Sequence, residues 1–324
     1  MHWLLTRPSD FSLEVFLKRS ECWLLPPFSV YAGRRLERVE RLSSGKTLLL
    51  SLTQTSAGLH LRSDQRLTAA EAEEVSRKAW RMLRLGENFS EFSRLLSEVP
   101  ILERCLGRGF RFLRGSTLFE DVVKARVMTH GMERVGAGDD CGFSKEREGW
   151  PQGERYLLAL VDHLGSALAA NPTRHAFPTP TQLSEGADKV RALLGTALGK
   201  DVVTIGESFL EAPVTFKELL RRDVPLETTR QALQIFPGMN AAAVALVMLA
   251  LGRYDYLPFD DLKAETGGRS AQRPECAAAA QPHLRAFFAN WQPWAGLVYW
   301  LWDWDACLPP DIFEEINFYE QPAG

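Results

Sequence analysis

The first 66 residues contain short apolar runs and alternating segments rather than a helical spacing of apolar positions. Residues 47–53 form an apolar run of strand length, and residues 59–62 alternate between apolar and polar side chains as a half-buried strand does. The Pro26-Pro27 step and the turn-forming residues 43–46 separate such segments. The pattern predicts a small antiparallel β domain over residues 1–66.

The apolar positions change to a helical period after residue 67. Thr68 and Glu71 have the spacing of a capping box, which predicts a helix over residues 71–85. One face of that helix would be formed by Val75, Ala79, Met82 and Leu83. Mainly helical patterns follow, so we expect an α+β protein in which residues 67–324 form a large all-α domain.

Several segments mark helix starts and breaks within the helical part. Ser116 and Thr117, followed by two early acidic residues, predict that a helix begins there. After the Pro-rich connector 177–181, Thr181 or Ser184 is expected to open the next helix. Residues 131–153 are rich in glycine and charge, which is typical of a mobile loop.

Composition places the chain among soluble globular proteins. It has 324 residues, of which 45% are hydrophobic and 24% charged, with a formal net charge of −3. Lys and Arg exceed Asp and Glu between residues 77 and 126, and these basic residues either bind DNA locally or occupy solvated helix faces. The longest apolar run, residues 241–252, is too short to span a bilayer, so no membrane partner is expected.

Cysteine usage and the first residues of the chain bear on the compartment. The five cysteines are widely spaced and odd in number, which favours free thiols in a reducing compartment. No two of them have the spacing of a zinc site, and the first residues lack the layout of a signal peptide. We therefore expect a cytoplasmic protein without a metal.

A Pro-Gly turn between two helical segments is the most informative feature of the chain. A first helix would end at Phe236, after which Pro237 and Gly238 turn the backbone and Asn240 caps a second helix. The N–H groups at the start of a helix form a site for a phosphate. Asp260 follows about twenty residues later, so its carboxylate would be held at a fixed distance from a phosphate bound at the turn.

Three segments in this order resemble the helix-hairpin-helix DNA glycosylase superfamily. They are residues 114–124, residues 176–183 and the hairpin with its aspartate, residues 231–260, and the similarity extends over residues 110–305. The β domain at the front, and Trp291 to Trp294 followed by Tyr299, are similar to the branch of 3-methyladenine and 8-oxoguanine glycosylases. The resemblance implies an N-terminal β domain before an all-α helix-hairpin-helix glycosylase domain.

The resemblance also implies partners and cofactors. Double-stranded DNA that contains a damaged base would be the partner of a monomer, which would be nucleoid-associated when bound. Iron–sulfur members of the superfamily carry four closely spaced cysteines after the aspartate, whereas this chain has only Cys276 and Cys307 there. No iron–sulfur cluster is therefore expected, and the one cofactor left open is a monovalent cation at the hairpin.

Asp260 matches the catalytic position of the family. A carboxylate beside the sugar C1′ stabilises the cationic transition state and orients the attacking water. Asp261 is the neighbouring alternative, and a purely structural reading makes Asp260 the cap of a following helix. In the same comparison, the residues that bind DNA are Pro237, Gly238, Met239, Asn240 and Ala241, and His130 fills the gap that the flipped base leaves.

The resemblance predicts hydrolysis without strand cleavage. Bifunctional members use a lysine as an amine nucleophile, and we match its position to Gln231, whose amide forms no Schiff base. Lys217 and Lys263 are near in sequence but lack the family's placement. Two alternatives stay open: a DNA-binding relative that has lost the chemistry, and a lyase that acts on abasic sites.

Residues of the base pocket follow from the same match. The matching positions are Ala242, Leu246 and Asp261, none of them aromatic, and Trp294 and Tyr299 are candidates for stacking on the base. Aromatic residues at helical spacing are more often part of a core. The expected substrate is a damaged purine, with an alkylated base slightly preferred over oxidised guanine.

Overall fold

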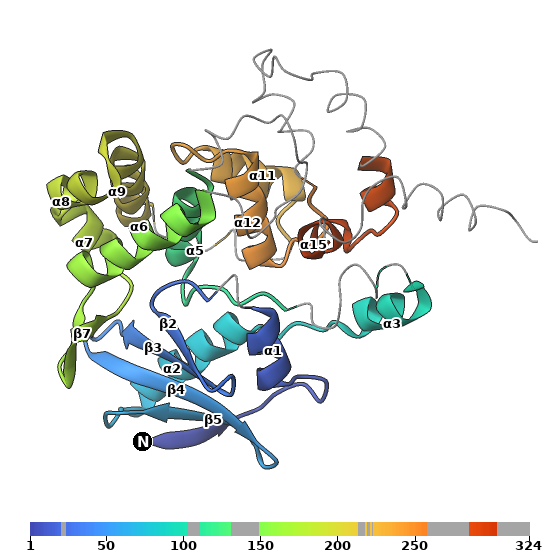
Figure 1. Ribbon diagram of the computed structural model, residues 1–324, viewed down its shortest axis with the longest axis horizontal. Coiled ribbons are helices and arrows are strands. Elements are labelled where there is room, and N and C mark those ends of the chain that lie inside the picture. The colour runs from blue at the N-terminus through green and yellow to red at the C-terminus, as the bar shows by residue number, and fades with distance from the viewer. Residues whose placement is uncertain are drawn as a thin grey trace, which may run out of the picture.

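The computed structural model describes residues 1–20, 24–100, 102, 111–130, 149–212, 218, 221, 223–257 and 285–302, and it consists of a five-stranded sheet followed by helices (Figure 1). The elements of the first part are β1 (His2–Leu5), α1 (Leu13–Arg19), β2 (Phe28–Tyr31), β3 (Arg35–Arg41), β4 (Thr47–Thr55), β5 (Gly58–Ser63), α2 (Ala69–Leu83) and α3 (Ser90–Glu98). Those of the second part are α5 (Leu118–Thr129), α6 (Gly149–Leu164), β6 (Ala167–Leu168), β7 (Asn171–His175), α7 (Pro180–Glu185), α8 (Ala187–Leu194), α9 (Thr196–Glu211), α11 (Leu226–Gln234), α12 (Ala241–Leu251) and α15 (Ala295–Leu301).

The sheet is antiparallel throughout and has the strand order β1-β5-β4-β3-β2. In β4, buried and half-buried residues alternate, so one face of the strand packs on a core. The predicted antiparallel β region is thus confirmed. Helix α1 was not predicted; it begins after Ser12, whose hydroxyl accepts the N–H of Val15, and its Leu13, Phe16 and Leu17 join the core of the sheet.

Helix α2 packs on the sheet (Figure 1). The predicted capping box is present, because the Thr68 hydroxyl accepts the N–H of Glu71 while the Glu71 carboxylate accepts the N–H of Thr68. All four residues of the predicted face, Val75, Ala79, Met82 and Leu83, are fully buried in the same core as the strands. The core of the sheet therefore includes a helix that follows residue 66.

Helices α5 and α12 pack against each other at the centre of the helical part (Figure 1). Every residue of α5 is buried, and α12 is apolar on all sides and buried except at Ala242. A helix that is apolar all round belongs inside a core. The ends of these two helices therefore define the surface at which any site between them opens.

Two boundaries of the helical part differ from the prediction. Helix α6 begins at Gly149, so residues 149–153 of the expected loop are helical, and residues 131–148 lie outside the described residues. Helix α7 begins at Pro180, capped by Thr179 rather than by Thr181 or Ser184, because Pro is suited to the first helical position and Gln182 completes a capping box. Among the described helices, none is long and apolar enough to cross a bilayer.

Candidate functional site

The predicted hairpin is present between α11 and α12. Gly238 adopts the left-handed backbone (φ +67°) that the turn requires, and Asn240 caps α12 by accepting the N–H of Ala243 at 2.8 Å. Capping by Asn240 is thus confirmed. Asn240 itself is extended (φ −72°), so its tolerance of left-handed angles is not used.

The turn lies at the surface of the protein. Gly238 is exposed, Pro237 and Asn240 are half-buried, and the preceding Ile235 is 82% exposed. The buried side chains of Met239 and Ala241 hold the turn from below. The backbone of the turn is therefore presented to solvent on a fixed base, as a phosphate-binding turn must be.

An ion pair between a buried guanidinium and a half-buried carboxylate lies directly beneath Gly238. Arg126 of α5 donates to Asp201 Oδ2 of α9 from Nε at 3.1 Å and from its terminal Nη2 at 2.8 Å. A Cβ atom on Gly238 would overlap with both side chains. The residue at this position must therefore be glycine for two reasons, its backbone angle and the closeness of the ion pair.

His130 lies at the same end of the molecule. It is the C-cap of α5, and its Nδ1 is 3.4 Å from Nη2 of Arg126. The structure therefore links His130 to the hairpin through the ion pair between Arg126 and Asp201. The predicted wedge role of His130 stays a prediction.

The two candidate catalytic acids lie outside the described residues, whereas the position matched to the lysine is described. Asp260 and Asp261 lie outside the described residues, as do Lys217, Lys263, Cys276 and Cys307. Gln231 is exposed on α11, where its amide donates to Glu227 at 2.8 Å. Gln231, which we match to the lysine of bifunctional members, lies six residues before Pro237, and this assignment stays a prediction.

A cavity opens between α5, α12 and the β region. Its volume of about 40 Å³ is room for two or three water molecules. Its lining residues are Leu25, Phe28, Arg84, Phe112, Arg114, Gly115, Asp121, Lys124, Ala125, Met128, Leu246, Leu249 and Ala250. Leu246, a predicted pocket residue, is thus among them.

The other predicted pocket residues that the structure describes lie elsewhere. Tyr299 is 1% exposed and contacts Phe288 edge-on in the helical core. Trp294 is half-buried and stacks on Tyr254, with ring centroids 5.5 Å apart. Neither lines the cavity, and nor does Ala242. The two aromatic residues expected to stack on the base are therefore not part of this cavity, as far as the structure describes it.

Charged side chains of the cavity wall were not predicted as site residues. Lys124 donates to Glu120 at 2.7 Å, and Arg38 of β3 makes two bonds to the same carboxylate, at 3.1 and 3.2 Å. Burial alone would raise the pKa of Glu120, but Arg38 and Lys124 outweigh it and hold that pKa far below its usual range. Burial lowers the pKa of Lys124, and Glu120 opposes this effect.

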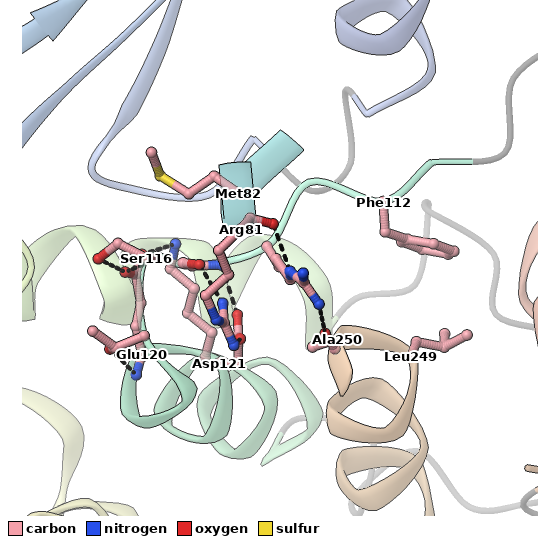
Figure 2. A network of polar contacts seen from close by, with 12 residues as sticks. Arg81, Met82, Phe112, Ser116, Glu120, Asp121, Leu249 and Ala250 are labelled. Atoms are coloured by element: carbon pink, nitrogen blue, oxygen red, sulfur yellow. Dashed lines mark hydrogen bonds and ion pairs between the residues drawn. The ribbon is translucent and has the colours of Figure 1, made fainter. Parts of the chain in front are cut away.

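Two further ion pairs each include a residue that lines the cavity. Arg81 contacts Asp121 at 2.5 Å, and Figure 2 shows this pair next to Glu120 and Ser116 at the start of α5. On the other side, Arg114 donates to the carbonyl of Ala250 at 2.5 Å and contacts Glu87 at 3.3 Å. These contacts tie the β region to α5 and α12 around the cavity.

The basic segment 77–126 is therefore neither a DNA-binding face nor a solvated one over most of its described length. Arg84 is fully buried, and Arg111, Lys124 and Arg126 are each less than 10% exposed. The exceptions are Arg77 and Arg94, which are exposed, and Arg94 pairs with Glu98 on α3. Sequence reasoning missed this because several acidic partners come from distant parts of the chain; Arg126 and Asp201 are 75 residues apart, and Arg111 and Asp10 are 101 apart.

No group of three or more His, Cys, Asp or Glu side chains clusters as a metal site would in the part of the chain that the structure describes. A monovalent cation at the hairpin stays a prediction.

Comparison with models of protein families finds no match, and comparison with curated proteins finds none. Solved structures do match. The 3-methyladenine DNA glycosylase from Archaeoglobus fulgidus has a TM-score of 0.64 at 20% identity, over 94% of this chain and 98% of that chain. An 8-oxoguanine glycosylase/lyase from Clostridium acetobutylicum, in complex with double-stranded DNA containing cytosine opposite 8-oxoguanine, has a TM-score of 0.53 at 13% identity, over 86% and 97%.

A third similar structure is MBOgg1 in complex with a low-affinity DNA ligand, with a TM-score of 0.53 at 14% identity, over 85% of this chain and 97% of that chain. At these identities the similarity establishes the fold: the chain has the α+β fold of these glycosylases over nearly their full lengths. The predicted fold class is confirmed.

Proposed function

We propose that this protein is a monofunctional DNA glycosylase of base excision repair, which hydrolyses the N-glycosidic bond of a flipped, damaged purine. The observation that supports this most is the surface turn at Gly238, fixed over an ion pair and placed beside the end of α5. The fold of the similar structures supports the same function.

The hairpin would bind the DNA backbone. A turn with its backbone exposed, followed by a capped helix start, offers N–H groups and a favourable dipole to a phosphate. Pro237, Gly238, Met239, Asn240 and Ala241 would form this contact. His130, at the neighbouring helix end, would occupy the space that the extruded nucleotide leaves.

Asp260 would be the catalytic carboxylate. As the C1′–N bond breaks, the base leaves with the bonding electron pair, and positive charge develops on the sugar beside the carboxylate. A water molecule then adds its oxygen to C1′ and loses a proton, while the departing base gains one. No metal or cofactor takes part, and the partner is double-stranded DNA with a damaged base, bound by a monomer.

The hydrolytic outcome is proposed because Gln231 stands at the position that we match to the lysine of bifunctional members. Without an amine nucleophile at the turn, no Schiff base forms, and the phosphodiester backbone stays intact. The sequence resemblance alone favours an alkylated purine slightly over oxidised guanine as substrate.

The test is base release from duplexes that each contain one lesion, with wild-type protein and with Asp260→Asn. We expect release of at least one damaged base by the wild type, a loss of about 100-fold or more in the variant, and no protein–DNA adduct after borohydride reduction.

Release that is undiminished in Asp260→Asn would exclude the catalytic assignment. A trapped adduct would instead identify an abasic-site lyase. Lesion-specific binding without any release would identify a DNA-binding relative that lacks the chemistry.

A further inference from the structure

The cavity is lined by residues of α5 and α12, the two helices whose ends carry His130 and the hairpin. Leu246 lies six residues after Asn240, and Lys124 lies six residues before His130. At 1.5 Å per residue, both are about 9 Å below the surface that carries the turn and His130. Arg126 beneath Gly238 shows that these two helix ends adjoin.

Lys124 is the residue of the cavity wall with donors to spare. Its side chain is less than 10% exposed, and Glu120, at 2.7 Å, is the one carboxylate among the described residues within 4 Å of its Nζ. The rings of Phe28 and Phe177 lie on other sides of the ammonium, with centroids at 5.0 and 5.6 Å. An ammonium has three N–H donors, so it can donate to a further acceptor in the cavity.

The charge of the wall also limits what can enter. Arg84, Arg114 and Lys124 line the cavity together with one carboxylate, Asp121, which is paired with Arg81, while Glu87 and Glu120 pair with these three cations from outside the lining. A cationic ligand would meet an ammonium in a space with little water to screen it, and like charges repel strongly there. A neutral ligand with a carbonyl oxygen would accept a charge-assisted hydrogen bond instead.

Resting on the proposed function, we infer that Lys124 selects the base: the cavity accepts a neutral purine that presents a carbonyl oxygen to Lys124 and disfavours a cationic, alkylated purine. This reverses the slight preference that the sequence resemblance suggested. A purine is larger than the cavity, so the apolar part of the lining must move on entry. Leu25, Met128 and Leu246 supply side chains that can do so, and Met is the most adaptable of them.

Two lesions with one guanine skeleton test this inference. 8-Oxoguanine is neutral and gains a carbonyl, whereas 7-methylguanine is cationic, so duplexes of identical sequence with either lesion form a matched pair. Rates are divided by the spontaneous release from each duplex, because the two glycosidic bonds differ in lability. We expect the wild type to accelerate release of 8-oxoguanine more, by about tenfold or above.

The variants separate selection from stability. Lys124→Met is expected to reduce release of 8-oxoguanine about tenfold and to leave or increase release of 7-methylguanine, while Lys124→Arg keeps the preference for the neutral base. The matched control is Lys78→Met. Lys78 belongs to the same buried network, through Glu40 at 2.6 Å, but it does not line the cavity, so the ratio of the two rates stays unchanged.

An equal or greater acceleration for 7-methylguanine by the wild type would overturn the inference, as would an equal loss for both lesions in Lys124→Met; the proposed function would survive either result. If neither base is released, fluorescence anisotropy with the same duplexes decides. Tighter binding of the 8-oxoguanine duplex that disappears in Lys124→Met would support the inference and exclude the glycosylase activity. Equal binding of both lesions and undamaged DNA would exclude both.

Discussion

Arg126 and Asp201 form the support on which the hairpin rests. The guanidinium of Arg126, 4% exposed, reaches from α5 across to Asp201 on α9, and Gly238 packs directly on the contact. Two helices and the turn therefore meet at one ion pair. The carboxylate orients the guanidinium, and the pair supports the backbone of the turn from below.

Replacing Gly238 with alanine should abolish this arrangement. The left-handed backbone costs a non-glycine residue about 1–2 kcal/mol, and the new Cβ atom would overlap with Arg126 and Asp201. We expect DNA binding, measured by anisotropy at fixed salt, to weaken more than tenfold and its salt dependence to become shallower as phosphate contacts are lost.

Gly45→Ala is the control, since Gly45 has φ +84° with open space around it; it should lose stability without losing affinity. Equal affinities of the two variants would contradict a role for the turn in DNA binding.

Removing one partner of the ion pair should be costly. Asp201→Ala removes the carboxylate that accepts two hydrogen bonds from the buried Arg126. Because Asp201 is 19% exposed, we expect a loss of about 1–3 kcal/mol in the free energy of unfolding, less than for a fully buried pair. Urea denaturation measures this, and the double variant with Arg126→Met should recover part of the loss. Asp188→Ala provides the control, because the pair of Asp188 with Arg191 on α8 is exposed and contributes under about 1 kcal/mol. A loss for Asp201→Ala no larger than that of the control would refute the supporting role.

The sequence predicted the elements whose signals are local. The capping box of Thr68 with Glu71 and the cap of Asn240 each depend on residues within one helical turn, and both are present. The hairpin was predictable because Pro237 and Gly238 restrict the backbone in ways that few other residues do. Helix α1 was missed because its seven residues are too short for a clear apolar period within a strand-rich segment.

The cavity and its charges could not be predicted, because they depend on contacts between distant elements. Lys124 follows Glu120 by one helical turn, a spacing typical of solvated pairs, and nothing local indicates that Arg38 joins them in the interior. Conversely, Tyr299 has the composition expected of a stacking residue, yet its edge-on contact with Phe288 places it in the core. Of the predicted pocket, Leu246 alone among the described residues lines the cavity.

Acid should destabilise the protein through Glu120. Its pKa in the folded state lies below the ordinary 4.5, since Arg38 and Lys124 outweigh the effect of burial. A lowered folded pKa contributes stability that is complete above the unfolded pKa and is lost as the pH falls towards the folded value. Below about pH 4.5 the free energy of unfolding should therefore fall by about 1.4 kcal/mol per pH unit from this one group.

Urea titrations in steps of pH should show that slope reduced in Glu120→Gln. Glu98→Gln, which removes one partner of an exposed pair, should leave the slope unchanged, and an unaltered slope in Glu120→Gln would exclude Glu120 as its source.

His130 should matter most where extrusion of the base is hardest. Its position at the end of α5, linked through Arg126 to the hairpin, allows the ring to stack in the space that a flipped nucleotide leaves. Stacking of a ring on a base contributes about 1–3 kcal/mol, so His130→Ala should slow base release from a fully paired duplex by about tenfold. With the lesion opposite an abasic site, extrusion is already easier, and the same variant should lose much less.

His163→Ala, at an exposed position in the last turn of α6, should release the base from both duplexes at the wild-type rate. If His130→Ala slows release from the two duplexes equally, the ring acts on a later step than extrusion, and the wedge role is wrong.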